Sequence, residues 1–485
     1  MNLLLPDGGF HEPLNRRQML RRFANGFGML GLAGLLSDDF IGCVLAEGKA
    51  NPLTVRPPPS PAKAKRVIFL FMSGGPSHVD TFDPKPRLAE DNGKPLPFEK
   101  PKLERTKTGN ILASPYTFKK HGESGTAISE LFPRLATCVD DLCIVRSMVA
   151  DNINHNGACL QMNTGEQAFS RPSLGSWLLY GLGSENQNLP GFVVIYDKRG
   201  GPFSGPANWS AGFLPAAYQG TVFRATGDPI LDLSPPADYV TPEQERARLD
   251  QLNWMNQNHA EQHPGSSELA ARIASYELAY RMQMCAPETV DITKESDETR
   301  RLYGLDHPVT APFGKQCLLA RRLVERGVRF IQLYNGSIVN QNVDTWDAHA
   351  SIVDNHGMHA AEVDEPIAGL ITDLKQRGLL DETLVMWHSE FGRMPISQRG
   401  VGRDHNPGAM TVFLAGAGIK GGQKIGATDE VGYKATEQVV TPHDLHATLM
   451  YLLGLDHKRV TYYFNGRHMR LTDVAGELIP QIVRA

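Results

Sequence analysis

The stretch Val67-Ile68-Phe69-Leu70-Phe71-Met72, followed at once by Ser73-Gly74-Gly75-Pro76, decides the fold of this 485-residue chain. Its unbroken apolar run has no polar face, which is typical of a strand buried on both sides in a parallel sheet. The small residues after the run predict a loop at the carboxyl end of the strand. In α/β proteins, functional sites gather at that end.

Further apolar runs and two amphipathic helices extend this pattern along the chain. A stripe from Val363 to Leu374 predicts a helix that ends at Gly378, and Thr441 and Pro442 are typical of the start of another. Strands that alternate with helices predict an α/β fold: a doubly wound, mostly parallel sheet with helices on both faces. The further predicted strands cover residues 142–145, 192–196, 328–334, 384–387 and 411–415.

The middle of the chain has a different character. Residues 199–308 begin with Gly- and Pro-rich loops and continue into polar segments, 241–258 and 266–284, that read as helices. We interpret this stretch as a partly helical insertion or cap within one large domain at 66–485.

The N-terminus predicts an export signal. Arg16 and Arg17 precede an apolar stretch at 23–36, which is shorter than the roughly 20 residues that span a membrane. Paired arginines favour the twin-arginine export machinery, so residues 1–46 are a signal peptide, with an amphipathic helix as the alternative. Residues 47–65 are a Pro-rich linker, and no transmembrane helix is expected in the mature chain. The predicted location is periplasmic or extracellular.

Composition excludes several classes of function. A formal net charge of -4 gives no basic footprint for nucleic acid. The 6 cysteines form no CxxC pair, so neither a zinc ribbon nor a disulfide scaffold is indicated, although one pair could oxidise after export.

Imidazole and carboxylate groups recur directly after the predicted strands. Such groups are the usual ligands of divalent metals, which here would be Zn, Mn, Ca or Mg. If the loops converge on one rim of the sheet, they form a metal site; alternatively, these residues make only caps and turns. The candidates are His78, Asp80, His155, Asp347, His349, Glu390 and His405.

Arginines accompany the same loops. Arg393 and Arg403, with Asp404 beside them, are candidates for binding a substrate. Arginine suits a bidentate grip on phosphate or sulfate. A buried ion pair with a nearby carboxylate explains the two arginines equally well.

Four motifs give the chain a resemblance to a known family. They are the segment from Ser73 to Asp83, the segment from Arg171 to Trp177, Glu390-Phe391-Gly392-Arg393, and Gly402-Arg403-Asp404-His405. On these the chain resembles a large uncharacterised family of exported bacterial sulfatase-like proteins, a branch of the alkaline phosphatase superfamily. The resemblance implies a doubly wound sheet, one or two divalent metals, and a nucleophile at the start of a helix.

The resemblance also shows where this chain departs from the superfamily. The sulfatase pattern Cys-x-Pro-x-Arg is absent, so a formylglycine sulfatase is not expected. By resemblance, His155 takes the place of the sulfatase cysteine and Cys159 that of the arginine. His155 is thus a candidate catalytic residue, as nucleophile, as general acid or base, or as a further ligand.

The resemblance assigns metal ligands as well. Asp347 and His349 resemble the middle-region ligands and His405 the late histidine, while Glu390 retains one acidic ligand. Ser73 stands where an aspartate is expected.

Three functions remain open from the sequence. The first is a metal-dependent hydrolase of phosphate or sulfate esters, on a small molecule or a polysaccharide. The second is a binding or scaffold protein of the cell envelope on the same fold with a remodelled centre. The third is an enzyme of another class, such as a lyase or peptidase, using the same ion.

Overall fold

The computed structural model describes residues 51–99, 107–230, 241–263, 267–339 and 342–484. The predicted signal peptide at 1–46 lies outside the described residues.

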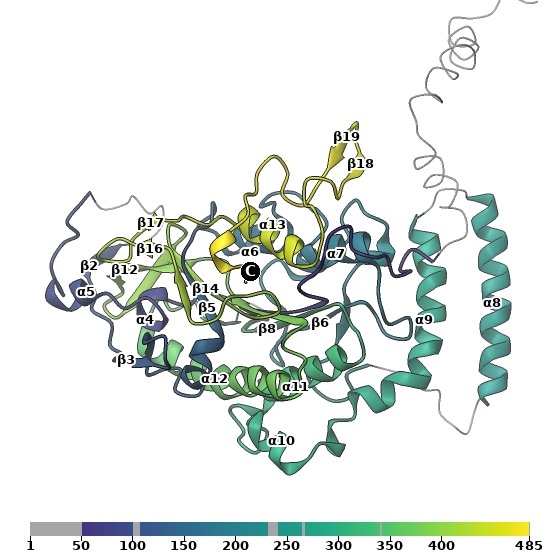
Figure 1. The fold of residues 1–485 in the computed structure, drawn as a ribbon, viewed down its shortest axis with the longest axis horizontal. Coiled ribbons are helices and arrows are strands. Elements are labelled where there is room, and N and C mark those ends of the chain that lie inside the picture. Colours follow the sequence, from purple (N-terminus) through teal and green to yellow (C-terminus); the bar gives the residue numbers. More distant parts are fainter. Residues whose placement is uncertain (1–50, 100–106, 231–240, 264–266, 340–341, 485) are drawn as a thin grey trace, which may run out of the picture. The chain divides into compact units, whose positions relative to one another are not determined.

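A large sheet forms the centre of the domain (Figure 1). All of its strands run parallel except β14, which is antiparallel to both of its neighbours, β11 and β5. The predicted α/β fold with a mostly parallel sheet is therefore confirmed. In spatial order the strands are β15 (Gln423–Ile425), β5 (Leu142–Met148), β14 (Met410–Gly416), β11 (Thr383–His388), β1 (Arg66–Met72), β8 (Phe330–Asn335), β6 (Phe192–Ile195) and β7 (Thr221–Phe223).

Strand β1 is apolar after its first residue because both of its faces are buried. Ile68 and Leu70 face one hydrophobic cluster, while Phe69 and Phe71 face another on the opposite side, and all four are at most 1% exposed. Because side chains alternate across a strand, both faces of the sheet must be covered by helices. One face packs against α11 (Ala311–Glu325) and α12 (Ile352–Gln376); the other packs against α6 (His155–Thr164), α7 (Leu174–Leu182) and α13 (Pro442–Leu452).

The two predicted amphipathic helices are present. Helix α13 begins with the expected capping box, in which Thr441 and Asp444 satisfy each other's backbone N–H groups. Helix α12 is longer than its apolar stripe predicts, because Ser351 caps it and Ile352 begins it. Polar residues at 354–356 interrupt the apolar pattern after Ile352 and Val353 and hide this start from a search for apolar periodicity.

A smaller antiparallel sheet stands where the sequence suggested only loops. It consists of β12 (Gly392–Gln398), which pairs with both β13 (Gly402–Asn406) and β2 (Thr108–Ile111). Its polar sequence lacks alternation, yet the sheet holds Arg393 and Arg403 fully buried. Ion pairs made by those two side chains, described below, are what allow these strands to pack inward.

The stretch 199–308 contributes to the central sheet through β7, which pairs with β6. Its predicted helical segments form α8 (Pro242–Gln262) and α9 (Ser267–Val290), and the division of the chain into an insertion and a main domain stays a prediction.

The remaining helices are α4 (His78–Thr81), α5 (Pro86–Glu90) and α10 (Asp297–Leu302). Short 3-10 helices are η1 (Leu135–Asp141), η2 (Gly205–Trp209), η3 (Ala216–Tyr218), η4 (Ile292–Lys294) and η5 (Pro480–Ile482). Two-stranded ribbons pair β3 (Phe118–His121) with β4 (Thr126–Ser129), β9 (Ser337–Val339) with β10 (Asn342–Asp344), β16 (Ala427–Thr428) with β17 (Ala435–Glu437), and β18 (Tyr462–Phe464) with β19 (Arg467–Met469).

The described part of the Pro-rich linker lies on the domain instead of standing away from it. Backbone N–H groups of Arg56, Ser60 and Lys63 donate to carbonyls of Leu182, Gly454 and Leu452. Within the described ranges, no helix has the length and apolar character needed to cross a membrane. The cysteines whose side chains are described, Cys138, Cys143, Cys159 and Cys317, are buried and free.

Candidate metal centre

Four side chains meet at the carboxyl edge of the central sheet. His155, Asp347, His349 and His405 each offer one ligand atom, and these atoms all lie within 4.8 Å of one another. They come from three segments far apart in the sequence. His155 opens α6 after β5, Asp347 and His349 lie between β10 and α12, and His405 lies in β13.

Local structure fixes the ring of His155. Asn154 caps α6 by accepting a hydrogen bond from the N–H of Asn156. Ser204 donates to the carbonyl of Asn156, at 2.9 Å, and thereby holds the preceding residue, Phe203, over the helix start. The rings of Phe203 and His155 lie parallel with centroids 4.0 Å apart. The imidazole is therefore held in one plane before any ligand arrives.

The loop after β1 packs against the backbone of the segment that carries Asp347. The N–H of Trp346 donates to the carbonyl of Ser73 at 2.9 Å. Gly74 has a φ of +111°, and a Cβ there would lie 2.6 Å from the backbone nitrogens of Trp346 and Asp347. Only glycine fits between the first strand and the Asp347 loop.

Substituting Gly74 by alanine is therefore expected to disturb the site as well as the fold. We expect a loss of about 1–3 kcal/mol in unfolding free energy from the left-handed backbone alone. The contact with Asp347 should in addition lower bound metal, measured by elemental analysis.

The matched control for this variant is Gly93→Ala. Gly93 also has a positive φ, +79°, but no atom lies within 4 Å of a Cβ there. It should lose stability without losing metal. Equal metal loss in both variants would contradict the close packing of Gly74 against Asp347.

The three imidazoles share one orientation. In each, Nδ1 faces an oxygen acceptor, so the neutral form of the ring would carry its proton on Nδ1 and a lone pair on Nε2. Oxygen acceptors behind metal-binding histidines are the usual means of fixing this tautomer. The acceptors are Glu390 Oε1 for His155 at 2.7 Å, Ile153 O for His405 at 2.8 Å, and Gln398 Oε1 for His349.

The Nε2 atoms all point at one carboxylate. Distances from Nε2 to an Asp347 oxygen are 3.4 Å for His155, 2.9 Å for His349 and 3.2 Å for His405. The Nε2 of His155 is buried and has no hydrogen-bond partner among the described residues. A proton on Nε2 or a cation between the rings and the carboxylate would satisfy these contacts.

Charges around Asp347 are unbalanced. Burial on its own would raise the pKa of the Asp347 carboxyl, but the guanidinium of Arg393, 2.5 Å away, and the surrounding imidazoles hold that pKa well below its usual range. Burial lowers the pKa of His405, whereas in His155 the carboxylates of Asp347 and Glu390 outweigh burial and raise the pKa. Arg393 is paired with Asp347, whereas His155 lies between the carboxylates of Asp347 and Glu390, which favour positive charge at its ring.

Glu390 lies behind this cluster and not in it. It is fully buried; Oε1 accepts from the N–H of Gly74 at 2.8 Å and from His155, and Oε2 accepts from the hydroxyl of Ser389 at 2.7 Å. With both oxygens occupied in this way, it orients His155, whereas the sequence suggested a direct ligand.

His78 and Asp80 also lie outside the cluster. The imidazole of His78 is buried against the carbonyl of Gly432 at 2.7 Å. Asp80 is fully buried and accepts from Arg403 at 2.7 Å and from the hydroxyl of Ser77 at 2.5 Å. The hydrogen bonds of both side chains hold the segment after β1 in place. Neither side chain lies in the cluster of possible metal ligands, where the sequence predicted them.

The candidate substrate-binding residues are mostly structural in position. Arg403 is fully buried by its pair with Asp80, and Arg393 is fully buried against Asp347 and the carbonyls of Gly74 and Gly75. The buried ion pair, one of the two readings of these arginines, matches this geometry. Asp404 lies at the edge of the cluster, 3.8 Å from Nδ1 of His349.

The sequence did not point to Phe203, Gln398 or the carbonyl of Ile153. The Gly- and Pro-rich sequence around Phe203 indicated a turn, but not that Phe203 stacks on the ring of His155. Gln398 belongs to β12, whose strand was not recognised, and a backbone carbonyl has no residue-type signal.

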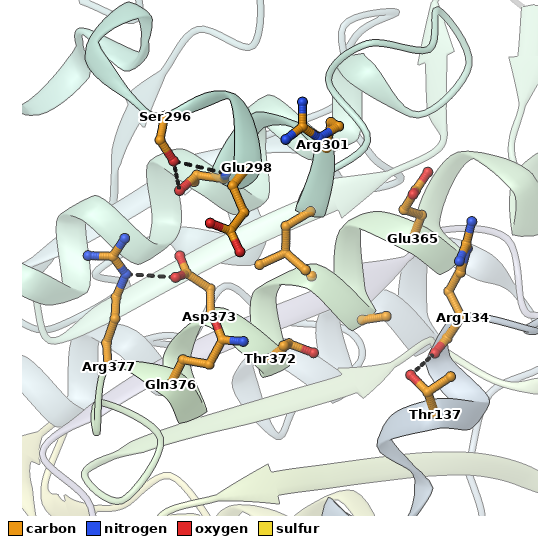
Figure 2. A pocket seen from close by; sticks show the side chains of 14 residues that line it. Arg134, Thr137, Ser296, Glu298, Arg301, Glu365, Thr372, Asp373, Gln376 and Arg377 are labelled. Atoms are coloured by element: carbon orange, nitrogen blue, oxygen red, sulfur yellow. Dashed lines mark hydrogen bonds and ion pairs between the residues drawn. The ribbon is translucent and has the colours of Figure 1, made fainter.

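A cavity of the described part of the chain lies elsewhere and has no part in this centre. It has a volume of about 750 Å³ and opens between α10, α12 and the start of η1 (Figure 2). Figure 2 shows a polar lining in which Arg377 pairs with Asp373 and Ser296 caps α10. None of the four clustered side chains lines it.

Comparison with known proteins places the whole domain in one family. The family described as "Protein of unknown function (DUF1501)" matches residues 64–483. No curated protein matches the chain in sequence.

Solved structures similar to this chain have low sequence identity. A phosphonate monoester hydrolase from Silicibacter pomeroyi is 12% identical, covering 69% of this chain and 70% of that chain with a TM-score of 0.34. A sulfatase from Pseudoalteromonas sp. is 13% identical, covering 85% and 72%, with a TM-score of 0.35. A protein in the alkaline phosphatase superfamily from Vibrio parahaemolyticus is 11% identical, covering 84% and 71%, with a TM-score of 0.34.

Proposed function

The chain belongs to the DUF1501 family, and we propose that it is an exported metal-dependent hydrolase of phosphate or sulfate esters, of small molecules or of a polysaccharide. The observation that carries the proposal is the shared orientation of three imidazoles, each with Nδ1 on an oxygen and Nε2 toward Asp347. With Nδ1 as the donor of each ring, the three Nε2 atoms and the Asp347 carboxylate are left facing one another as possible ligands of one cation.

The donor set fits a divalent cation. Three imidazole nitrogens and one carboxylate oxygen are ligand types that zinc takes, and this set of four has one protein ligand more than the three of a catalytic zinc site, so water or an ester would bind as a fifth ligand. Calcium and magnesium prefer oxygen ligands, so the set favours Zn²⁺ or Mn²⁺ among the ions considered. The buried, unpartnered Nε2 of His155 is the atom that most needs such a partner.

Each residue then has a part in the chemistry. His155, His349, His405 and Asp347 would hold the cation, which would supply positive charge for an ester oxygen and lower the pKa of a water. Glu390 keeps the Nδ1 proton on His155, and Arg393 holds the Asp347 carboxylate in place. His155 thereby serves as a ligand, not as the nucleophile.

The exposed side of the cluster is where an ester would approach. The side chain of His349 is 27% exposed, while those of Asp347, His405 and His155 are 10–15% exposed. Phe203 and Phe391 flank the ring of His155 and limit access of water from that side.

The activity test uses the protein as purified, after chelation, and after reloading with Zn²⁺ or Mn²⁺. Aryl phosphates and aryl sulfates are the probes. We expect hydrolysis of at least one class that disappears on chelation and returns with metal. A protein that holds metal but cleaves neither class would favour the binding or scaffold function; a protein that takes up no metal would overturn the proposal.

Export is a separate part of the proposal and rests on Arg16 and Arg17. Ligands from residue 155 to residue 405 come together only in the folded chain, so a route that carries folded proteins suits this site. With Arg16→Lys and Arg17→Lys together, we expect the protein to accumulate in the cytoplasm at its unprocessed length. Fractionation and mass spectrometry measure this, and normal processing of the variant would argue against the twin-arginine machinery.

A further inference from the structure

A second cavity lies on the same edge of the sheet, beyond the metal centre. It has a volume of about 430 Å³ and is bounded by the ends of β6 and β7 and by α11. Apolar side chains make most of its wall, among them Ile195, Ile292 and Leu319. None of the four clustered ligands lines it. This volume is large enough for a ligand of small-molecule size.

Three cations surround this apolar wall. Lys198 follows β6, Arg224 follows β7, and Lys315 lies on α11, so three separate segments bring them to one opening. All three side chains are exposed, and in the part of the chain that the structure describes none of their head groups has an ion-pair or hydrogen-bond partner. Cations that gather without carboxylate partners leave a positive potential at the opening.

Two further polar features belong to the wall: the N-terminal end of a helix and a buried oxygen for which the described residues offer no hydrogen-bond partner. The first residues of α11, Ala311 and Pro312, line the cavity, so the positive end of a 15-residue helix faces it. Gln316 is 3% exposed and donates to the carbonyl of Tyr196, but its Oε1 has no partner among the described residues. A buried acceptor in this state is normally satisfied by water, and because an anionic head group has no proton to donate, the cations and the helix end are what favour an anion.

We propose that this cavity binds a small amphipathic anion, with its apolar body against the wall and its carboxylate, sulfate or phosphate head at Lys198, Arg224 and Lys315. An apolar wall selects the body of such a ligand through burial of its surface. The three cations at the opening favour a ligand with a negatively charged head group. The site does not rest on the proposed hydrolysis, since it shares no residue with the metal centre.

The test compares two probes with the same tail and opposite charge, octanoate and octylammonium, by titration calorimetry on the full exported protein. We expect saturable binding of octanoate and none of octylammonium. Replacing all three cations (Lys198→Gln, Arg224→Gln, Lys315→Gln) should weaken octanoate binding about tenfold, since each exposed charge contributes a modest amount. Ala311→Phe, which fills the cavity, should abolish it.

The matched control removes three exposed cations elsewhere: Lys119→Gln, Lys120→Gln and Lys424→Gln. It should leave octanoate binding unchanged. Equal binding of the two probes, equal loss in both triple variants, or no saturable octanoate binding would overturn the proposal. Removing metal with a chelator should not change octanoate affinity, so this result stands or fails separately from hydrolysis.

Discussion

Replacing His349 and His405 together by alanine is expected to remove the bound metal. The folded protein should contain about one equivalent of zinc or manganese, and the double variant almost none. Four-ligand zinc sites are worth about 10–16 kcal/mol, so two ligands contribute roughly half of this, and affinity should fall by at least about 10⁴-fold. Elemental analysis after dialysis measures the content, and competition with a chelator measures the affinity.

The control for this variant is a second pair of histidines. His259 lies in the last turn of α8 and His263 directly follows the helix; both are exposed, and their ring centroids are 4.3 Å apart. Such a pair can take up metal adventitiously. Replacing both by alanine should leave the metal content unchanged. Loss of metal from this control, with retention in the His349 and His405 variant, would locate the metal at the C-terminal end of α8 and return the cluster to a structural role.

Catalytic activity should fall together with the metal content of the protein. If the ester is cleaved at this centre, kcat/KM of the double variant should fall by about a thousandfold, which corresponds to the several kcal/mol that a metal contributes to charge stabilisation. Glu390→Gln should have a smaller effect, about 10- to 100-fold, because Glu390 acts through His155. An equal effect of the two variants would mean that Glu390 is a ligand after all.

The fold was predictable because its signal is local. The continuous apolar runs of β1, β8 and β11 can be read one at a time, and each needs burial on both faces. The rule that sites lie at the carboxyl ends of strands then indicated that His155, Asp347, His349 and His405 could share one rim. No side-chain geometry was needed for that step.

The division between ligands and supporting residues was not predictable in the same way. Glu390 and His405 both follow β11, yet one lies beneath α6 and the other faces Asp347. The position of His405 depends on β13, which pairs with β12, and these two polar strands carry the buried arginines Arg403 and Arg393, paired with Asp80 and Asp347. The pair of Arg403 and Asp80 joins residues far apart in the chain, and sequence spacing carries no sign of it.

That pair supports the last prediction. Arg403 and Asp80 are both fully buried, and Arg403 also donates to the carbonyl of Leu112 at 3.1 Å. Removing one member leaves a buried charge without compensation. We expect Arg403→Met to lower the free energy of unfolding by about 3–5 kcal/mol, measured by chemical denaturation. Arg403→Met combined with Asp80→Asn should recover part of this loss, because no buried charge is then left over.

The pH dependence of stability separates this mechanism from a loss of packing. Burial tends to raise the pKa of Asp80, but Arg403 holds that pKa below its usual value in the folded chain. The pair therefore stabilises fully above the ordinary carboxyl range and is lost as the pH falls through the folded-state pKa. Without Arg403, burial raises the pKa of Asp80, so stability should instead increase as the pH falls toward the ordinary carboxyl range. A variant that weakens in acid as the parent does would show that Arg403 contributes packing alone.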